Sequence, residues 1–205
     1  MKLQVTLALI SVLLPKALTL ECYRCIPDVS GTCTDTQTVC ADRCGSATAL
    51  VNTAGIEQKV SAKDCAVAAE CVNGSLNLGL MKMTINTQCC TTDRCNTQVP
   101  AALPFGSPNG KKCYTCVNND CTGTVSCLGG EDQCVSATAT ASGVQVTMKG
   151  CASRSLCTAD ASSMQAAGIT GSVSCCEGNL CNSAEGVKLS LLIMLVPLIS
   201  SVLFI

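Results

Sequence analysis

The chain of 205 residues contains no histidine and no tryptophan, and only 2% of its residues are aromatic. The absence of histidine removes the commonest general base, the commonest metal ligand, and the Ser-His and Cys-His nucleophile pairs. Acidic side chains are present, but Glu21, Asp28, Asp35 and Asp42 are scattered without a catalytic spacing. The sequence therefore predicts a protein that is not an enzyme and that holds neither a cofactor nor a metal.

Charge is also sparse and balanced, with 13 basic and 14 acidic residues. Lys111-Lys112 is the only adjacent basic pair, and there is neither a basic run nor an aromatic platform. Proteins that bind nucleic acid concentrate positive charge on one surface. Nucleic-acid binding therefore has no support in this sequence.

The scarcity of aromatic residues contrasts with twenty cysteines, which fall into two runs of ten. Successive gaps are 3, 8, 7, 4, 21, 6, 18, 1, 5 in the first run and 3, 5, 6, 7, 17, 6, 18, 1, 5 in the second. The near-repeat predicts two domains. Small domains without large apolar side chains bury too little surface to be stable, and disulfides make up the difference. Each link around a loop of about 20 residues contributes roughly 3 kcal/mol in the chain-entropy description.

Residues 1–19 have the features of a secretory signal peptide. Lys2 is followed by an apolar stretch from Leu3 to Leu14, and Ala17 and Thr19 provide small residues before a cleavage point after Thr19. A membrane anchor is the alternative, although the stretch is shorter than the roughly 20 residues that span a bilayer.

The other end predicts a glycosylphosphatidylinositol (GPI) anchor. Leu189 to Ile205 is almost wholly apolar, and a short polar spacer separates it from the small-residue cluster Asn182-Ser183-Ala184. Asn182 is the expected attachment residue because Ala184, two positions on, is small, and residues 183–205 would then be removed. A tail-anchored or single-pass helix is the alternative. Both ends predict an extracellular location, where disulfides persist.

Between the two ends, a Pro- and Gly-containing linker at residues 97–112 separates units at 20–96 and 113–182. Period-two alternation predicts strands over 81–86 and 144–149. Hairpin turns are expected at 52–55 and 141–143. Helical periodicity is weak, with one or two turns expected over 159–167. The predicted fold class is small, disulfide-rich and all-β.

The two units begin and end with matching cysteine motifs. The first unit opens with Leu20-Glu21-Cys22-Tyr23-Arg24-Cys25 and closes with Cys89-Cys90-Thr91-Thr92-Asp93-Arg94-Cys95-Asn96. The second opens with Cys113-Tyr114-Thr115-Cys116 and closes with Cys175-Cys176 through Cys181-Asn182. These motifs resemble those of three-finger domains of the lymphocyte-antigen-six and urokinase-receptor superfamily. The resemblance implies two tandem three-finger domains with five disulfides each. It also implies that Asn96 and Asn182 hydrogen-bond into the base of the fingers.

Spacing alone leaves the disulfide connectivity open, since ten cysteines allow hundreds of pairings. Two CxxC pairs, Cys22 with Cys25 and Cys113 with Cys116, have zinc-site or thioredoxin-like spacing, but a secreted chain favours disulfides. The pairing implied by the resemblance is Cys22–Cys44, Cys25–Cys33, Cys40–Cys65, Cys71–Cys89 and Cys90–Cys95, then Cys113–Cys134, Cys116–Cys121, Cys127–Cys151, Cys157–Cys175 and Cys176–Cys181.

The remaining features point to binding. Asn73-Gly74-Ser75 is an N-glycosylation acceptor. The second fingers (45–64, 135–150) and the third (72–88, 158–174) are the expected contact surfaces. Leu50, Val51, Leu78 and Leu80 are either exposed contacts or packed on the sheet.

The sequence thus predicts a GPI-anchored surface receptor or adhesion protein for an extracellular protein ligand. One alternative is a secreted phospholipase inhibitor of the gamma type, and another is a modulator of an ion channel or receptor.

Overall fold

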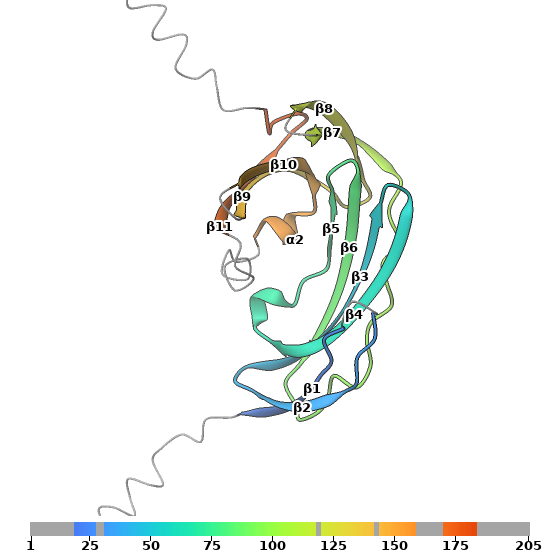
Figure 1. Ribbon diagram of the computed structural model, residues 1–205, viewed down its shortest axis with the longest axis vertical. Helices are drawn as coiled ribbons and strands as arrows, with labels where there is room; N and C mark the ends of the chain where they lie inside the picture. Colours follow the sequence, from blue (N-terminus) through green and yellow to red (C-terminus); the bar gives the residue numbers. More distant parts are fainter. Residues whose placement is uncertain (1–18, 28–30, 118–119, 142–143, 159–169, 184–205) are drawn as a thin grey trace, which may run out of the picture.

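The computed structural model describes residues 19–27, 31–117, 120–141, 144–158 and 170–183, and almost all of its regular structure is β-strand (Figure 1). The first unit contains β1 (Leu20–Arg24), β2 (Thr36–Cys40), β3 (Arg43–Thr53), β4 (Ile56–Ala66), a 3-10 turn (Ala68–Glu70), β5 (Gly74–Asn77) and β6 (Met81–Cys90). The second contains β7 (Pro108–Val117), β8 (Asp120–Leu128), β9 (Gln133–Ala141), β10 (Val144–Ala152), the short helix α2 (Arg154–Cys157) and β11 (Thr170–Glu177).

Consecutive antiparallel strands form the fingers. In the first unit these are β1–β2, β3–β4 and β5–β6. In the second they are β7–β8 and β9–β10, with β11 returning beside β9. This all-β arrangement of two finger units confirms the predicted fold class.

Local sequence explains the longest hairpin. β3 and β4 are joined at Ala54 and Gly55, whose φ angles of 52° and 89° lie in the left-handed region. Glycine adopts this region without a steric penalty. The Asn52 side chain also accepts a hydrogen bond of 3.1 Å from the Gly55 N–H. The turn predicted at 52–55 is therefore confirmed.

The two alternating segments are strands, as predicted: residues 81–86 lie in β6 and residues 144–149 in β10. β7 begins at Pro108, inside the interval 97–112 that the composition predicts as a linker, because Pro108 and Lys112 pair with β8. The expected turn at 141–143 falls mostly, and the expected helical turns at 159–167 entirely, outside the described residues.

One sheet crosses both units, which the sequence does not predict. Its seven strands run in the order β11-β9-β10-β5-β6-β3-β4. The join is between β10 of the second unit and β5 of the first, where Cys151 lies opposite Asn77 and Ala152 opposite Leu76. In Figure 1 the sheet curves, with α2 on its inner side.

The core of each unit is made of sulfur. Cys22, Cys40 and Cys44 form the buried cluster of the first unit, and Cys113, Cys127, Cys134 and Cys151 form that of the second. Ala66, Val135 and Ala152 are the other buried apolar residues of the described part of the chain. Disulfides therefore occupy the place that aromatic side chains take in larger cores.

The segment between the units packs on the sheet of the first unit. Leu103 and Ala101 accept hydrogen bonds of 2.7 and 2.8 Å from the side chains of Thr84 and Asn86 on β6. The buried Lys63 donates to the carbonyl of Thr97 at 2.7 Å. Backbone carbonyls of this segment thus accept hydrogen bonds from polar side chains of the sheet. Among the described residues, no helix has the length and apolar character needed to cross a membrane.

Candidate binding surface

Ten disulfides fix the base of the fingers, and each joins the cysteines that the resemblance pairs. They are Cys22–Cys44, Cys25–Cys33, Cys40–Cys65, Cys71–Cys89, Cys90–Cys95, Cys113–Cys134, Cys116–Cys121, Cys127–Cys151, Cys157–Cys175 and Cys176–Cys181. The sulfurs of Cys113, Cys127 and Cys151 lie within 4.8 Å of one another. All three are already bonded in disulfides, so they offer no thiolate to a metal.

One asparagine in each unit ties the chain end to the fingers. Asn96 accepts from the Tyr23 N–H at 2.9 Å and donates to the carbonyls of Tyr23 and Gly45 at 2.8 and 2.9 Å. Asn182 does the same with Tyr114 and Val135, at distances between 2.8 and 3.0 Å. Both asparagines are buried. The structural role implied by the resemblance therefore appears in both units.

The junction between the units is held by hydrogen bonds as well as by strand pairing. The Ser153 N–H donates to the Ser75 carbonyl at 2.9 Å, and the Ser153 hydroxyl accepts from the Ser75 N–H at 3.1 Å. The Thr115 hydroxyl donates to the Leu78 carbonyl at 2.7 Å, and the Asn77 amide donates to the Ser126 carbonyl at 3.1 Å. The β5 side of the third finger is thus fixed to the second unit.

Close backbone packing at the junction depends on glycine. A Cβ on Gly150 would lie 2.1 Å from the Asn77 carbonyl oxygen, and one on Gly74 would lie 2.8 Å from Leu156 Cγ. A larger residue at position 150 meets backbone and requires one unit to move relative to the other. At position 74 the atoms met belong to side chains of the second unit, which would have to shift.

A buried carboxylate, Glu131, also lies at the junction, with 2% of its surface exposed. It accepts a hydrogen bond of 2.7 Å from the Leu128 N–H. Burial raises the pKa of Glu131, against the opposing effects of the Leu128 N–H, of hydrogen bonds from Ser75 and Asn77, and of the positive charge of Lys82. Its neighbour Asp132 behaves differently, because the hydrogen bonds and charge of Arg154 outweigh desolvation and lower its pKa.

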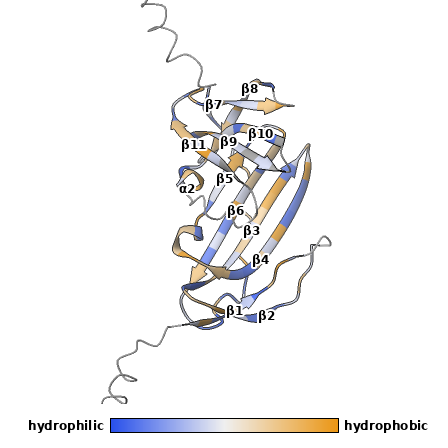
Figure 2. Cartoon of the chain, turned by 60° about the vertical axis from the view of Figure 1, so that its left-hand side comes forward, coloured by the Kyte–Doolittle hydropathy of each residue, from blue (hydrophilic) through white to orange (hydrophobic). Residues whose placement is uncertain are grey.

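The fingers of the first unit present an apolar surface on the side of the sheet where α2 lies. Directly opposed residues of an antiparallel pair point to the same face, so the strand register defines the members of this inner face. Its apolar members are Ala47, Ala49 and Val51 on β3, Ile56, Val60 and Ala62 on β4, Leu76 on β5, and Met81, Met83 and Ile85 on β6. The polar residues Thr53, Gln58 and Thr87 lie on the same face. Figure 2 shows hydrophobic and hydrophilic residues alternating along these strands.

The inner face is only partly buried. Ile56 is 68% and Val60 is 42% exposed, and the apolar residues of β3, β5 and β6 are half-buried. The opposite face carries polar residues such as Thr48 and Thr84, which are buried. Apolar side chains that stay accessible while polar ones are covered indicate a surface for another molecule.

The four leucine and valine residues expected to be either exposed contacts or packed on the sheet are divided between these two outcomes. Leu80 is 61% exposed at the tip of the third finger. Leu50, Val51 and Leu78 are half-buried. Leu78 is held at the junction by Thr115, so most of the third finger is an internal element of the sheet. Residues 159–169, which belong to the predicted third finger of the second domain, lie outside the described residues.

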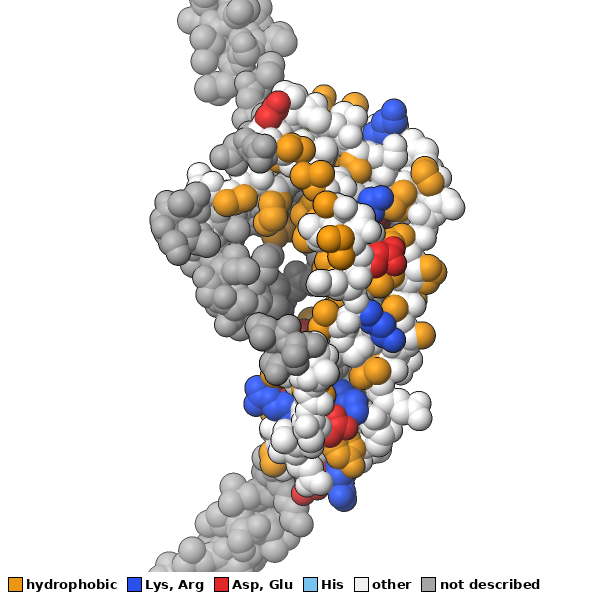
Figure 3. Space-filling model, turned by 45° about the vertical axis from the view of Figure 1, so that its right-hand side comes forward, with side chains coloured by type: hydrophobic (Ala, Val, Ile, Leu, Met, Phe, Trp, Pro, Cys, Tyr) orange, Lys and Arg blue, Asp and Glu red, His pale blue; other side chains and the backbone are white. Residues whose placement is uncertain are grey.

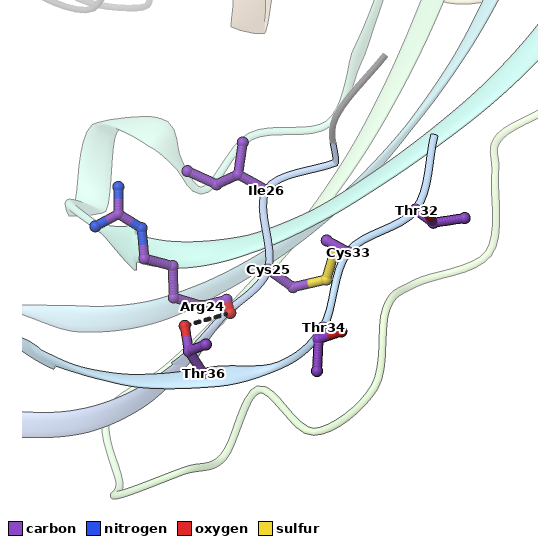
Figure 4. Close-up of a pocket in the computed structure, with 7 residues that line it drawn as sticks. All are labelled: Arg24, Cys25, Ile26, Thr32, Cys33, Thr34 and Thr36. Carbon is purple, nitrogen blue, oxygen red and sulfur yellow. Dashed lines mark hydrogen bonds between the residues drawn. A yellow bond between two sulfur atoms is a disulfide. The ribbon is translucent and has the colours of Figure 1, made fainter. Parts of the chain in front are cut away.

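A shallow pocket of about 520 Å³ lies in the first finger, beside the Cys25–Cys33 disulfide (Figure 4). Arg24 and Thr32 lie at opposite ends of it, and Thr36 donates a hydrogen bond of 3.1 Å to the Arg24 carbonyl. The side chains in the close-up do not converge on one point, and the pocket contains no acid–base pair. Its chemistry gives no basis for catalysis.

Charge on the molecular surface is mixed. On the side displayed in Figure 3, Lys and Arg lie among Asp, Glu and hydrophobic side chains. Several of these charges are paired, as in Arg24 with Asp64 and Arg154 with Asp132, both at 3.4 Å. Arg154 also pairs with Glu177. Over 47–53 of β3, 56–62 of β4 and 81–87 of β6, the strand register places no charged side chain on the inner face, so apolar contact distinguishes that face.

The two expected modification sites are placed differently. Asn73 is exposed, its side-chain oxygen accepts from the Thr87 N–H at 2.7 Å, and its carbonyl accepts from the Ser155 hydroxyl at 2.6 Å. Asn182 is buried, and its carbonyl accepts a 2.8 Å hydrogen bond from Lys149. Sequence reasoning missed Asn77, Glu131 and Gly150, because nothing local marks a contact between units.

Two tandem units, each with fingers extending from five disulfides and a terminal asparagine, define a pair of three-finger domains. A sequence model of the u-PAR/Ly-6 domain matches residues 18–98 and 109–184. The chain belongs to the u-PAR/Ly-6 domain family.

Relatives include both surface receptors and inhibitors. The chain is 30% identical to Ly6/PLAUR domain-containing protein 3 of Mus musculus over 195 residues, covering 80% of this chain and 53% of that protein. It is 33% identical to phospholipase A2 inhibitor NAI of Notechis ater over 153 residues, covering 68% and 76%. It is 34% identical to the urokinase plasminogen activator surface receptor of Mus musculus over 116 residues, covering 48% and 33%. The chain thus spans about half of the first relative and a third of the last.

Proposed function

We propose that this protein is a GPI-anchored cell-surface receptor or adhesion protein that binds an extracellular protein ligand with the inner face of its first domain. The observation that carries the proposal is the accessible apolar surface of β3, β4 and β6, which ends at the exposed finger-tip residue Leu80. Interfaces between proteins have apolar centres from which charged residues are depleted. The inner face has this composition. The similarity to a urokinase plasminogen activator surface receptor supports the receptor class.

The rigid junction supports this role. Because β5 is paired on both sides, the inner face continues towards α2 and the second domain as one surface. A preformed surface loses less conformational freedom on binding than separate flexible fingers would lose. The second domain therefore contributes to affinity by holding the third finger in place.

We further propose that residues 1–19 are removed as a signal peptide, that the lipid is attached at Asn182 in place of residues 183–205, and that Asn73 carries a glycan. Attachment uses the main-chain carbonyl of Asn182, so its side chain keeps its hydrogen bonds to Tyr114 and Val135. The exposure of Asn73 is compatible with a glycan.

Binding is tested with the ectodomain, residues 20–182, as bait in a proximity or pull-down screen on cells. Leu80→Lys and Met83→Lys are expected to abolish recovery of the ligand, since each places a charge in an apolar contact. Val39→Lys is the matched control, because Val39 on β2 is 65% exposed and lies outside the inner face. Equal loss with all three variants, or loss with none, would contradict the proposal.

Anchoring is tested separately, by treating expressing cells with phosphatidylinositol-specific phospholipase C. Release of the protein into the medium is the expected result. Protein that stays on the membrane would reject the anchor without affecting the binding proposal.

A second candidate function is a secreted inhibitor of phospholipase A2. It is favoured by the alignment with inhibitor NAI, which covers 76% of that protein. Inhibition of a secreted phospholipase A2 by the ectodomain, together with an intact, unlipidated C-terminus in the medium, would establish this alternative.

A further inference from the structure

The strand β4 forms one edge of the seven-stranded sheet, and part of this edge is open. At its end nearest the disulfides, β4 is paired by the first finger: the Lys63 N–H donates to the Cys25 carbonyl at 2.9 Å, and the Lys63 carbonyl accepts from the Cys25 N–H at 2.8 Å. The main-chain groups of Lys63 therefore point away from β3. Alternate residues of a strand point their polar groups to the same side, so those of Glu57, Lys59 and Ser61 also point outward.

Nothing in the described part of the chain pairs with this edge near the finger tip. Cys25–Lys63 is the isolated bridge on the outer side of β4, and among the described segments none other than β3 donates to or accepts from the main chain of Glu57 or Lys59. Figure 1 shows the tip half of β4 at the margin of the sheet. Unpaired N–H and C=O groups in a row are a template for another strand.

The side chains at this edge pair favourably with the same side chains of a second copy that runs antiparallel. In an antiparallel pairing of two copies about a two-fold axis at Gln58, Glu57 lies opposite Lys59 of the second copy, and Ile56 lies opposite Val60. The Lys59 ammonium has no hydrogen-bond or ion-pair partner among the described residues, and Glu57 has one weak contact, 3.5 Å from the Asn52 amide. Ile56 is the most exposed large apolar side chain described.

Favourable side-chain pairs form on both faces of the joined sheet. The charged pairs lie on one face of the sheet and the apolar pairs extend the inner face of one copy into that of the other. Opposite charges and β-branched residues directly across from each other are favourable cross-strand pairs.

The charges of Glu57 and Lys59 favour one register. Glu57 and Lys59 are both outward-pointing, so they form a hydrogen-bonded pair in this arrangement. Moving the axis to Glu57 would place two glutamates opposite each other, and moving it to Lys59 would do the same with two lysines. Like charges directly opposed are destabilising. Edge lysines usually prevent sheets from joining, but here the glutamate two residues away cancels that protection for a second copy of the same chain.

We propose that the protein forms a two-fold homodimer through the outer edge of β4, with Glu57 paired to Lys59 of the second copy and Ile56 to Val60. The contact is short and is expected to be weak in dilute solution. Confinement of the chains to one surface would raise their effective concentration and favour pairing. The proposal does not depend on the identity of the ligand.

For the test, two copies of the full chain, each with a different epitope tag, are expressed in the same cells. The measurement is how much of one tagged copy is captured together with the other. Lys59→Glu and Glu57→Lys each turn two attractive pairs into two repulsive ones, and each is expected to reduce homotypic co-capture about tenfold. When Lys59→Glu carries one tag and Glu57→Lys the other, opposite charges face each other again and co-capture is expected to return.

A further variant tests the main-chain contact. Lys59→Pro removes an N–H that points outward and has no role in the β3–β4 ladder, and proline is tolerated on edge strands. It is expected to abolish co-capture while surface expression stays at the wild-type level. Gln98→Pro, in the linker, is the control for the presence of a proline. Absence of wild-type co-capture, or wild-type co-capture that the charge variants do not change or that the mixed pair does not restore, would overturn the proposal.

Discussion

The substitution Gly150→Ala tests the cross-domain sheet. The added Cβ would lie 2.1 Å from the Asn77 carbonyl oxygen, whereas real Cβ atoms essentially never approach within 3.0 Å of such an atom. The two backbones therefore have to separate by about 1 Å, since packed interiors have no free volume to absorb the overlap. Both atoms belong to regular strands, so rotation of a flexible side chain cannot relieve the contact.

The loss of stability can be estimated from the hydrogen bonds that this separation breaks. The pairings of Cys151 with Asn77 and Ala152 with Leu76 lie directly at the contact. The Asn77–Ser126 hydrogen bond of 3.1 Å is adjacent. Loss of about three hydrogen bonds at roughly 1 kcal/mol each predicts destabilisation by about 3 kcal/mol, which is the range measured for overpacked sites.

The assay is calorimetric unfolding of the ectodomain with its disulfides intact. The wild type is expected to unfold in one transition and Gly150→Ala in two, because the domains separate before either melts. Gly130→Ala is the matched control, since nothing lies within 4 Å of the added Cβ. A Gly150→Ala profile that coincides with that of Gly130→Ala would show that close packing at residue 150 does not hold the two domains together.

Three further predictions concern single side chains. Asn96→Ala removes three hydrogen bonds at the finger base and is expected to lower the free energy of unfolding by about 3 kcal/mol in denaturant titrations; an unchanged midpoint would contradict this role. Burial raises the pKa of Glu131 in the folded state. Its contribution to the free energy of unfolding is therefore greatest below the pKa of the unfolded chain, about 4.5, and decreases as the pH rises through the folded pKa. Thermal melts of Glu131→Gln should lack this decrease, and an identical pH profile would refute it. Arg154→Ala is expected to return the lowered pKa of Asp132 towards its usual value, as followed by NMR titration; an unshifted titration would show that another group lowers it.

The sequence predicts the framework of this protein well because the framework depends on cysteine. The spacing of the ten cysteines in each run predicts the domain count, whereas the structural role of Asn96 and Asn182 was implied by the family resemblance. Alternation marks β6 and β10 because each has one apolar face. Disulfide pairing came from the resemblance and not from spacing, since spacing leaves it open.

The junction was not predictable for a physical reason. β5 is four residues long, Gly74–Asn77, and its partner strand belongs to another domain. Pairing of this kind depends on tertiary packing, which leaves no periodic signal in the sequence. For the same reason Asn77 and Glu131 resemble ordinary surface residues in the sequence, although each is almost fully buried. The predicted contact residue Leu78 likewise lies at this junction.

The two finger domains form one continuous sheet through β5 and β10. Solution NMR of the isotopically labelled ectodomain tests it directly, by measuring nuclear Overhauser effects between the two strands. The structure predicts cross-strand contacts between Cys151 and Asn77 and between Ala152 and Leu76, as strong as those between β3 and β6. Contacts within each domain but none between β5 and β10 would contradict the account.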